Sequence, residues 1–204
     1  AYMITIKDVY KTYISGETEV RALRGVTLGI EAGEFLSIAG PSGSGKTTLL
    51  NLIGSIDTAD SGTIVIDGEA VSEKDKRERA LFRRNKLGFI FQTYNLIPVL
   101  TAYENVSFAL SLLKLDEREV RDRTMNLLAE VGLEGMEDRL PARLSGGQQQ
   151  RVAVARALVK DPQIVLADEP TANLDSGTGE AILELMRKLN VKHDTTFIFS
   201  THDS

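Results

Sequence analysis

Gly40-Pro-Ser-Gly-Ser-Gly-Lys-Thr47 is the stretch of the chain that says most about its fold. Before it, the apolar run at residues 35–39 has the character of a buried parallel strand. After it, residues 47–53 have the apolar spacing of a helix. The octapeptide has Walker A spacing, and a preceding strand with a following helix is the context that this motif requires. The sequence therefore predicts a strand, loop and helix that bind the phosphates of a nucleotide.

Each part of this loop has a predicted task. The glycines let backbone amides turn toward the β- and γ-phosphates, and the helix N-terminus adds its partial positive charge. Lys46 brings a full charge to the same oxygens, and the Thr47 hydroxyl is placed to ligate a bridging Mg²⁺. The alternative, a glycine-rich turn without function, is disfavoured by the flanking strand and helix. The predicted nucleotide contacts are Gly40, Ser42, Gly43, Ser44, Gly45, Lys46, Thr47 and Thr48.

Two acids, Asp168 and Glu169, directly follow the apolar run at residues 164–167. A nucleotide hydrolase needs such a pair beside a Walker A loop. We predict that Asp168 holds the Mg²⁺ shell through water, and that Glu169 orients and deprotonates the attacking water. Without the loop, the pair would more often be a solvated strand exit.

Composition limits the class of protein. The 204 residues suit a single domain, with room for an inserted subdomain. A formal net charge of −5 argues against a general nucleic-acid binder. Since no apolar run approaches the roughly 18 to 20 residues that span a bilayer, we expect no direct membrane insertion. Zero cysteines exclude disulfides and thiolate metal sites, and the two histidines are too few for a multi-histidine site.

Hydrophobic periodicity divides the chain into an α/β part and a helical part. Residues 92–159 carry helical spacing and contain no good strand, so they are predicted to form an inserted helical subdomain. Residues 1–91 and 160–204 are predicted to form the α/β core, with an antiparallel sheet near the start and a mostly parallel sheet after it. The expected strands are residues 4–9, 26–30, 35–39, 61–68, 87–91, 164–167 and 196–200. The expected helices are residues 47–53, 72–85, 103–113, 117–131, 147–159 and 178–189.

Leu144-Ser-Gly-Gly-Gln148 resembles the signature motif of the nucleotide-binding domains of ABC transporters. Physically it is a second anion site, with two glycines that expose amides ahead of a helix. By itself, Ser-Gly-Gly is more often a helix N-cap. Five further motifs in the family's order, including the specific stretch at residues 166–176, favour the resemblance over essentially the whole chain. It implies a P-loop NTPase fold that uses ATP and Mg²⁺.

The resemblance also implies roles for single residues. Tyr13 matches the aromatic residue that stacks on adenine, with Tyr10 as a competing candidate and plain strand packing as the ordinary alternative. Gln92 matches the Q-loop glutamine that senses Mg²⁺ and the attacking water, or it is a polar strand end. Asp175 matches the D-loop residue that faces the opposite subunit, or it is a helix N-cap. His202, followed by Asp203, matches the switch histidine near the γ-phosphate, or it is structural.

Two such domains are expected to pack head to tail, most simply as a homodimer. Ser145, Gly147 and Gln148 of one subunit would then close over ATP held by Lys46 and Thr47 of the other. The predicted catalytic residues are Lys46, Gln92, Glu169 and His202, and the predicted Mg²⁺ ligands are Thr47, Gln92 and Asp168. Opening after hydrolysis would drive integral membrane permease subunits, which places the chain at the cytoplasmic face of the cell membrane. Residues 93–98 are the candidate docking surface, or they are a loop that packs on the domain's own helices.

Within the family, residues 91–105 and the triple glutamine at 148–150 look most like the lipoprotein-release and macrolide-export group. The alternative is a signalling ATPase that regulates envelope or division enzymes without transport. Chromosome-maintenance ATPases would need a long coiled coil between the Walker motifs, and a kinase would not need the signature segment. The chain ends two residues after His202, where the family usually continues, so we expect a truncated C-terminal end and a weakened hold on that histidine.

Overall fold

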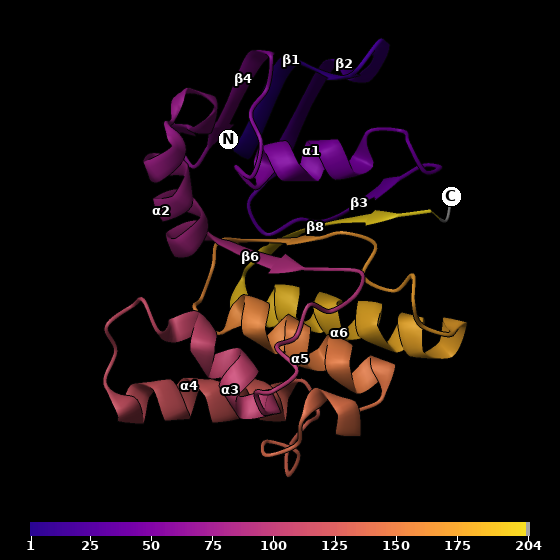
Figure 1. Ribbon diagram of the computed structural model, residues 1–204. Helices are drawn as coiled ribbons and strands as arrows, with labels where there is room; N and C mark the ends of the chain where they lie inside the picture. The colour runs from indigo at the N-terminus through magenta and orange to yellow at the C-terminus, as the bar shows by residue number, and fades with distance from the viewer. Residues whose placement is uncertain (203–204) are drawn as a thin grey trace.

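The computed structural model describes residues 1–202. It contains two four-stranded sheets (Figure 1). The antiparallel sheet has the order β2-β1-β4-β5 and contains β1 (Tyr2–Ser15), β2 (Thr18–Glu31), β4 (Ser61–Ile66) and β5 (Glu69–Ala70). The parallel sheet has the order β3-β8-β7-β6 and contains β3 (Phe35–Ala39), β6 (Leu87–Ile90), β7 (Ile164–Ala167) and β8 (Thr196–Thr201). The predicted pair of sheets, one antiparallel and one parallel, is therefore confirmed.

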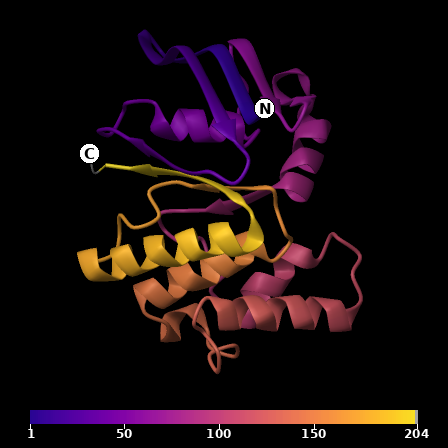
Figure 2. The same cartoon turned by 180° about the vertical axis from the view of Figure 1, so that it is seen from behind.

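The helices lie in layers above and below the parallel sheet. They are α1 (Lys46–Ile53), α2 (Lys76–Lys86), α3 (Ala102–Ser107), α4 (Glu117–Glu130), α5 (Gly146–Leu158) and α6 (Ser176–His193). Short 3₁₀ turns occupy Val71–Glu73, Phe108–Leu110 and Pro141–Arg143. Helix α1 lies between the two sheets, α5 and α6 cover the opposite face of the parallel sheet, and α3 and α4 pack beyond α5 (Figures 1 and 2). Among the described residues, none of these helices combines the length and apolarity that crossing a bilayer requires.

Alternate residues of the central strand β7 enter two separate hydrophobic cores. Ile164 and Leu166 pack into the core under α1 and the antiparallel sheet, whereas Val165 and Ala167 pack into the core with α5 and α6. Successive side chains of a strand point to opposite faces, so a sheet covered on both faces needs an uninterrupted apolar run. The same two-sided burial explains why β7 was recognisable from the sequence.

Side-chain caps fix where most helices begin. An Asp, Thr or Ser at each N-cap accepts a hydrogen bond from the backbone N–H three residues later, which satisfies a donor that the helix leaves free. These caps are Asp75, Thr101, Asp116, Ser145 and Asp175. Because each cap depends on one local residue and not on tertiary contacts, the helix starts were predictable to within a few residues.

The strands expected at residues 4–9 and 26–30 are longer in the structure, as β1 and β2, and three further predicted elements differ from it. Strand β3 is not buried as expected: Ser37 and Ala39 are exposed, because β3 lies at the edge of the parallel sheet. The charged helix expected over residues 72–85 is split, because Asp75 adopts an extended conformation and caps α2. The helix expected over residues 103–113 ends early, at Ser107, and continues as a 3₁₀ turn. The C-terminal end of this helix depends on tertiary packing, which the hydrophobic periodicity of the sequence does not reveal.

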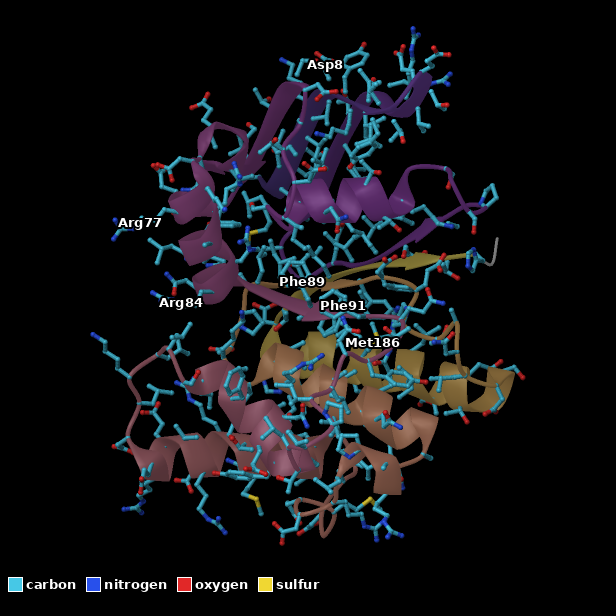
Figure 3. The ribbon with its side chains drawn as sticks, in the orientation of Figure 1. Asp8, Arg77, Arg84, Phe89, Phe91 and Met186 are labelled. Carbon is cyan, nitrogen blue, oxygen red and sulfur yellow. The ribbon has the colours of Figure 1, made fainter. Side chains whose placement is uncertain are left out.

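The region predicted as a helical subdomain contains α3, α4 and α5, and no described strand begins within residues 92–159. It is not separate from the core, because α5 packs directly on β6. Gly88 permits this approach: a Cβ on that residue would collide with the carbonyl oxygen of Ala157 on α5. At the surface, Arg77 of α2 points away from the body of the molecule (Figure 3). The subdomain boundaries stay a prediction.

Candidate functional site

The loop before α1 is shaped by glycine and curls around the ammonium group of Lys46. Gly45, the residue before α1, has φ 90°, and a Cβ there would strike the carbonyl oxygen of Ala22, so only glycine fits. Lys46 Nζ donates to the carbonyl oxygens of Gly40 and, at 3.4 Å, of Pro41. Only 7% of Lys46 is exposed. The cation is therefore held inside the loop, at the N-terminus of α1, where anions are favoured.

Asp168 lies at the carboxyl end of β7, against the first turn of α1. Its oxygens accept from Thr47 Oγ1 at 3.3 and 3.4 Å, and Oδ1 also accepts from Ser200 Oγ at 2.9 Å. The Thr47 hydroxyl and the Asp168 carboxylate are thus side by side although 121 positions separate them in sequence. The structure brings together two of the three predicted Mg²⁺ ligands.

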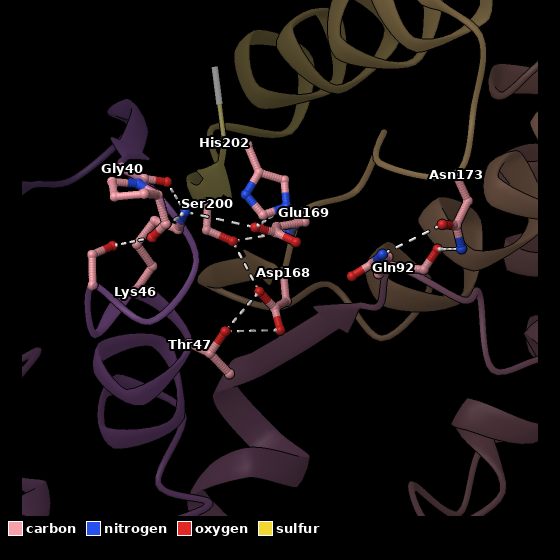
Figure 4. A network of polar contacts seen from close by, with 11 residues as sticks. Gly40, Lys46, Thr47, Gln92, Asp168, Glu169, Asn173, Ser200 and His202 are labelled. Carbon is pink, nitrogen blue, oxygen red and sulfur yellow. Dashed lines mark hydrogen bonds and ion pairs between the residues drawn. The ribbon is translucent and has the colours of Figure 1, made fainter. Parts of the chain in front are cut away.

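Glu169 lies between two nitrogen groups from different parts of the chain (Figure 4). Its Oε1 is 2.9 Å from His202 Nε2 and 3.6 Å from Lys46 Nζ. Its φ of 46° is in the left-handed region, which a residue with a Cβ rarely adopts. The Glu169 N–H donates to Ser200 Oγ at 2.9 Å, which ties the turned backbone to β8. Such strained positions are frequent at sites of chemistry, and this one gathers three of the four predicted catalytic side chains.

Tyr13 lines a pocket of about 250 Å³ together with Gly43, Lys46, Thr48 and other residues of the loop. Its hydroxyl donates to Asp57 Oδ2 at 2.7 Å. Burial, followed by this hydrogen bond, raises the pKa of Tyr13, so the phenol stays protonated at neutral pH. Tyr10, the competing candidate, does not line this pocket. The structure therefore favours Tyr13 over Tyr10 as the aromatic residue beside the phosphate loop.

Gln92 is anchored by the segment that follows Glu169. It forms two hydrogen bonds with Asn173: Gln92 Nε2 donates to Asn173 Oδ1 at 3.3 Å, and Asn173 Nδ2 donates to the Gln92 carbonyl at 3.2 Å (Figure 4). It lines a second pocket, of about 500 Å³, together with Glu169 and His202. Gln92 is therefore near the predicted catalytic residues, while its contact with Mg²⁺ stays a prediction.

The segment that resembles the signature motif starts α5. Ser145 Oγ accepts from Gln148 N–H at 3.1 Å, and Gln148 Oε1 accepts from Ser145 N–H at 2.9 Å, which is a capping box. Gly147 is buried, and a Cβ there would come within 2.6 Å of Thr178 Cγ2. In the described chain, none of Ser145, Gly147 and Gln148 lines either pocket beside Glu169. A role at ATP therefore requires a second copy.

Asp175 caps α6, as the alternative interpretation of this residue anticipated. Its carboxylate accepts from Thr178 N–H at 3.1 Å and from Thr178 Oγ1 at 2.7 Å. These hydrogen bonds hold the pKa of the Asp175 carboxyl below its usual value. Asp175 is also exposed and lines the pocket of about 500 Å³ beside Glu169. The cap and the predicted contact with an opposite subunit are thus compatible.

Comparison with known proteins decides the family. The family model described as ABC transporter matches residues 23–172. An ABC transporter ATP-binding protein of Thermotoga maritima is 48% identical over 201 residues, which cover 98% of this chain and 86% of that protein. The chain belongs to the ABC transporter family. Within this ABC family, the macrolide export ATP-binding/permease protein MacB of Hyphomonas neptunium is 50% identical over 201 residues, covering 98% of this chain but 31% of that longer protein.

A solved ABC structure has the same fold. The cassette MJ0796 matches with a TM-score of 0.88 and 47% identity, covering 98% of this chain and 88% of that one. MJ0796 is from Methanocaldococcus jannaschii. The solved structure is a dimer in a post-hydrolysis state, bound to ADP and Pi. This similarity confirms the predicted fold class.

The oxygens of this ABC cassette fit the hard cation Mg²⁺. The Thr47 hydroxyl and the Asp168 carboxylate converge beside the phosphate loop, and Mg²⁺ prefers such ligands together with phosphate oxygens and water. Among the described residues, no cluster of three or more His, Cys, Asp or Glu side chains could hold a metal ion. Thr47 and Asp168 would hold such a cation together with phosphate oxygens and water.

Sequence reasoning missed three residues that position this ABC site. Ser200 binds Asp168 and the backbone of Glu169, and Asn173 binds Gln92. Gln150 is fully buried and donates to the carbonyl oxygens of Phe91 and Pro170, just outside the predicted Gln92 and Glu169 positions. The expected strands at 164–167 and 196–200 did carry a signal for Ser200, because neighbouring parallel strands end at one edge of a sheet.

The segment at residues 93–98 packs on the cassette's own helix α5, and part of it stays exposed. Arg156 on α5 donates to the carbonyl oxygens of Tyr94 at 2.6 Å and Asn95 at 2.7 Å, so the loop is fixed on one of the cassette's own helices. Ile97 is nevertheless 37% exposed, and Val99 just beyond it is 79% exposed. Docking of an ABC permease on this segment stays a prediction.

Proposed function

We propose that the chain is the ATP-binding and ATP-hydrolysing subunit of an ABC transporter, and that two copies work together to drive a membrane permease. The observation that carries the proposal is the convergence of Lys46, Thr47, Asp168, Glu169 and His202 at one edge of the parallel sheet. A cation, two oxygen ligands and a carboxylate held by a histidine are the groups that ATP hydrolysis needs.

In the proposed mechanism, the loop amides and Lys46 bind the β- and γ-phosphates of ATP. Thr47, and Asp168 through water, would hold Mg²⁺, which would supply positive charge beside the phosphates. The phosphates would pair with the Lys46 ammonium group, which lies 3.6 Å from Glu169 in the structure. Glu169 is then free to accept a proton from the attacking water, while the 2.9 Å contact with His202 fixes the carboxylate.

The second half of each site comes from another copy of the chain. Ser145 and the N-terminus of α5 form an anion site that the described chain does not bring to its own phosphate loop. Head-to-tail pairing would place this segment on the γ-phosphate bound by the partner. The dimeric state of MJ0796 with ADP and Pi supports this arrangement. Loss of the γ-phosphate removes a group that both copies hold, so hydrolysis opens the dimer.

The relatives bear on the kind of transporter, whereas the site carries no information on the transported substrate. MacB is named as an export ATP-binding/permease protein, and its similarity to this chain supports an efflux or lipoprotein-release system. A permease partner would place the chain at the cytoplasmic face of the cell membrane. The exposed Ile97 and Val99 are the apolar residues that such a partner would cover.

Affinity purification of the natural protein from gently solubilised membranes tests the transporter assignment. We expect co-purification of a permease with few membrane spans and a large extracytoplasmic domain, identified by mass spectrometry. Recovery of a division or envelope-enzyme regulator instead would support a signalling ATPase. Recovery of no membrane protein would contradict the transporter assignment and leave an ATPase without a permease.

A further inference from the structure

The side chain of Tyr13 is held by a carboxylate from another part of the chain. Tyr13 is 39% exposed near the end of β1, where an aromatic ring without a partner could change rotamer freely. Its hydroxyl donates to Asp57 Oδ2 at 2.7 Å, across 44 positions of sequence. Asp57 lies in the turn that follows α1, the helix whose N-terminus forms the phosphate loop. One hydrogen bond therefore links the ring to the phosphate-binding unit.

Asp57 is itself fixed on its other oxygen. Oδ1 accepts from Thr58 N–H at 2.8 Å and lies 3.4 Å from Lys11 Nζ. Burial raises the pKa of Asp57, but the hydrogen bonds from Tyr13 and Thr58 and the charge of Lys11 outweigh it and hold the pKa below its usual value. The acceptor of the Tyr13 hydroxyl is thus a carboxylate at neutral pH.

Lys11 supports the same arrangement from the strand. Its ammonium group donates to the Thr58 carbonyl at 2.7 Å, lies 3.6 Å from Asp60 Oδ1, and stands 5.3 Å from the centre of the Tyr13 ring. Only 12% of the Lys11 side chain is exposed. Asp60 also accepts from Thr12 N–H at 2.7 Å. The turn at residues 57–60 is therefore bound to β1 at Lys11 and Thr12, the two residues before Tyr13.

We propose that Asp57, supported by Lys11, is a positioning residue that presets the Tyr13 ring for the adenine base. The proposal rests on the function proposed above, in which Tyr13 faces the base of ATP in the pocket of about 250 Å³. A ring that is already ordered loses less conformational entropy when the base stacks on it, so the affinity for nucleotide is higher. Asp57 touches neither the base nor the phosphates in this account and acts only through Tyr13.

The alternative is that the contacts of Asp57, Lys11 and Tyr13 only hold β1 against the turn after α1. The two accounts differ in which part of the nucleotide responds. Loss of a positioning residue weakens binding of the base and leaves the phosphates unaffected. Loss of a purely structural contact would disturb α1 and weaken binding of the phosphates as well.

Calorimetric titration with ADP and with inorganic tripolyphosphate, which has no base, separates the two accounts. For Asp57→Ala we expect the ADP dissociation constant to rise about 3- to 10-fold, with a change of less than about twofold for tripolyphosphate. Tyr13→Phe keeps the ring and removes only the hydrogen bond, so we expect the same loss. The double variant should bind ADP no more weakly than the weaker single variant, because both substitutions remove the hydrogen bond between Tyr13 and Asp57.

Asp138→Ala is the matched control, since Asp138 is an exposed aspartate in a loop away from the pocket. An unchanged ADP affinity in Asp57→Ala, an equal loss for ADP and tripolyphosphate, or additive losses in the double variant would each overturn the inference. If Asp57→Ala does not fold, an unchanged ADP affinity in Tyr13→Phe overturns it alone. A wild-type chain that binds neither ligand would instead contradict the proposed function, and the inference with it.

Discussion

At the scale of single residues, the Ser200 hydroxyl connects Asp168 to Glu169. The hydroxyl donates to Asp168 and accepts from the backbone of Glu169, each at 2.9 Å, and the residue is fully buried. Asp168 and Glu169 are adjacent in sequence but contact different groups, because Asp168 faces Thr47 and Glu169 faces Lys46. The left-handed backbone at Glu169 and its hydrogen bond to Ser200 hold this divergence.

Replacing Ser200 by alanine should reduce turnover more than binding. Ser200→Ala leaves the Glu169 N–H without an acceptor, which costs about 1 to 3 kcal/mol of folding stability. We expect kcat for ATP to fall about 10- to 100-fold, because the carboxylate is no longer fixed, with little change in KM. Steady-state kinetics measure both constants, and Ser111→Ala, at an exposed serine, is the control. A normal kcat in a folded Ser200→Ala protein would show that the hydroxyl does not position Glu169.

Lys46→Ala tests the phosphate loop at the same scale. Removal of the charge-assisted hydrogen bonds to phosphate should weaken Mg-ATP binding about 100-fold or more. Lys188→Ala, at a lysine whose side chain is 75% exposed on α6, should bind normally. Both affinities can be measured by titration calorimetry. Unaltered Mg-ATP affinity in Lys46→Ala would contradict the assignment of this loop.

At the scale of elements, the N-terminus of α5 combines a cap with a predicted ligand contact. Ser145 closes a capping box with Gln148, and this alone accounts for its conformation in the described chain. The proposed function adds a contact with the γ-phosphate held by a second copy. Stability measurements and dimer measurements separate these two roles.

Aspartate at position 145 is the discriminating substitution. Ser145→Asp keeps a good N-cap, so the free energy of unfolding should stay within about 0.5 kcal/mol of wild type, whereas Ser145→Ala should lose about 1 kcal/mol. The added negative charge faces the phosphates of the partner's ATP, so Ser145→Asp should not dimerise with ATP. Denaturant titration and ATP-dependent sedimentation test this pair of outcomes. An ATP-bound Ser145→Asp dimer would contradict a phosphate contact at this helix.

A second contact between elements joins the last residue of α4 to the end of α6. Glu130 lies 2.9 Å from Lys192 Nζ and 2.7 Å from His193 Nε2. Burial raises the pKa of Glu130, but the hydrogen bonds from His193 and Lys192 outweigh it and lower the pKa below its ordinary value of 4.5. This stabilisation is complete above that ordinary value and is lost as the pH falls through the lowered one.

Glu130→Gln should therefore destabilise the chain in a pH-dependent way. We expect a loss of about 1 kcal/mol at pH 7, which shrinks as the pH falls below about 4. Glu184→Gln is the control, because the Glu184 side chain is 71% exposed and lies 3.7 Å from Lys188 of the same helix. Urea unfolding at several pH values gives both differences. A loss that does not depend on pH would show that the charge of Glu130 is not what joins the helices.

At the scale of the whole molecule, elements with local sequence signals were predictable, whereas features that depend on distant contacts were not. The sequence predicted β7, α1 and the capped helices because their signals are local: a two-sided apolar run, a glycine loop and N-cap residues. It misjudged β3, whose exposure depends on which strand lies at the sheet edge. Ser200 and Asn173 escaped notice for the same reason, since each matters only through a partner brought close by the fold.

The proposed mechanism also requires two copies of the chain for a complete ATP site. Lys46 and Glu169 meet within one chain, whereas in the described residues the capped end of α5 lines neither of the two pockets beside Glu169. ATP would complete the connection between the copies, and hydrolysis at Glu169 would break it. The central claim is therefore that Glu169 serves chemistry and is not needed for ATP binding.

Comparison of Glu169→Gln with wild type, in one set of ATP-binding, ATPase and sedimentation measurements, tests that claim most directly, with Glu184→Gln as the control. The account predicts that Glu169→Gln binds ATP as tightly as wild type, loses at least about 100-fold in turnover, and accumulates as an ATP-bound dimer. Loss of ATP binding in Glu169→Gln, or turnover equal to that of wild type, would contradict the account.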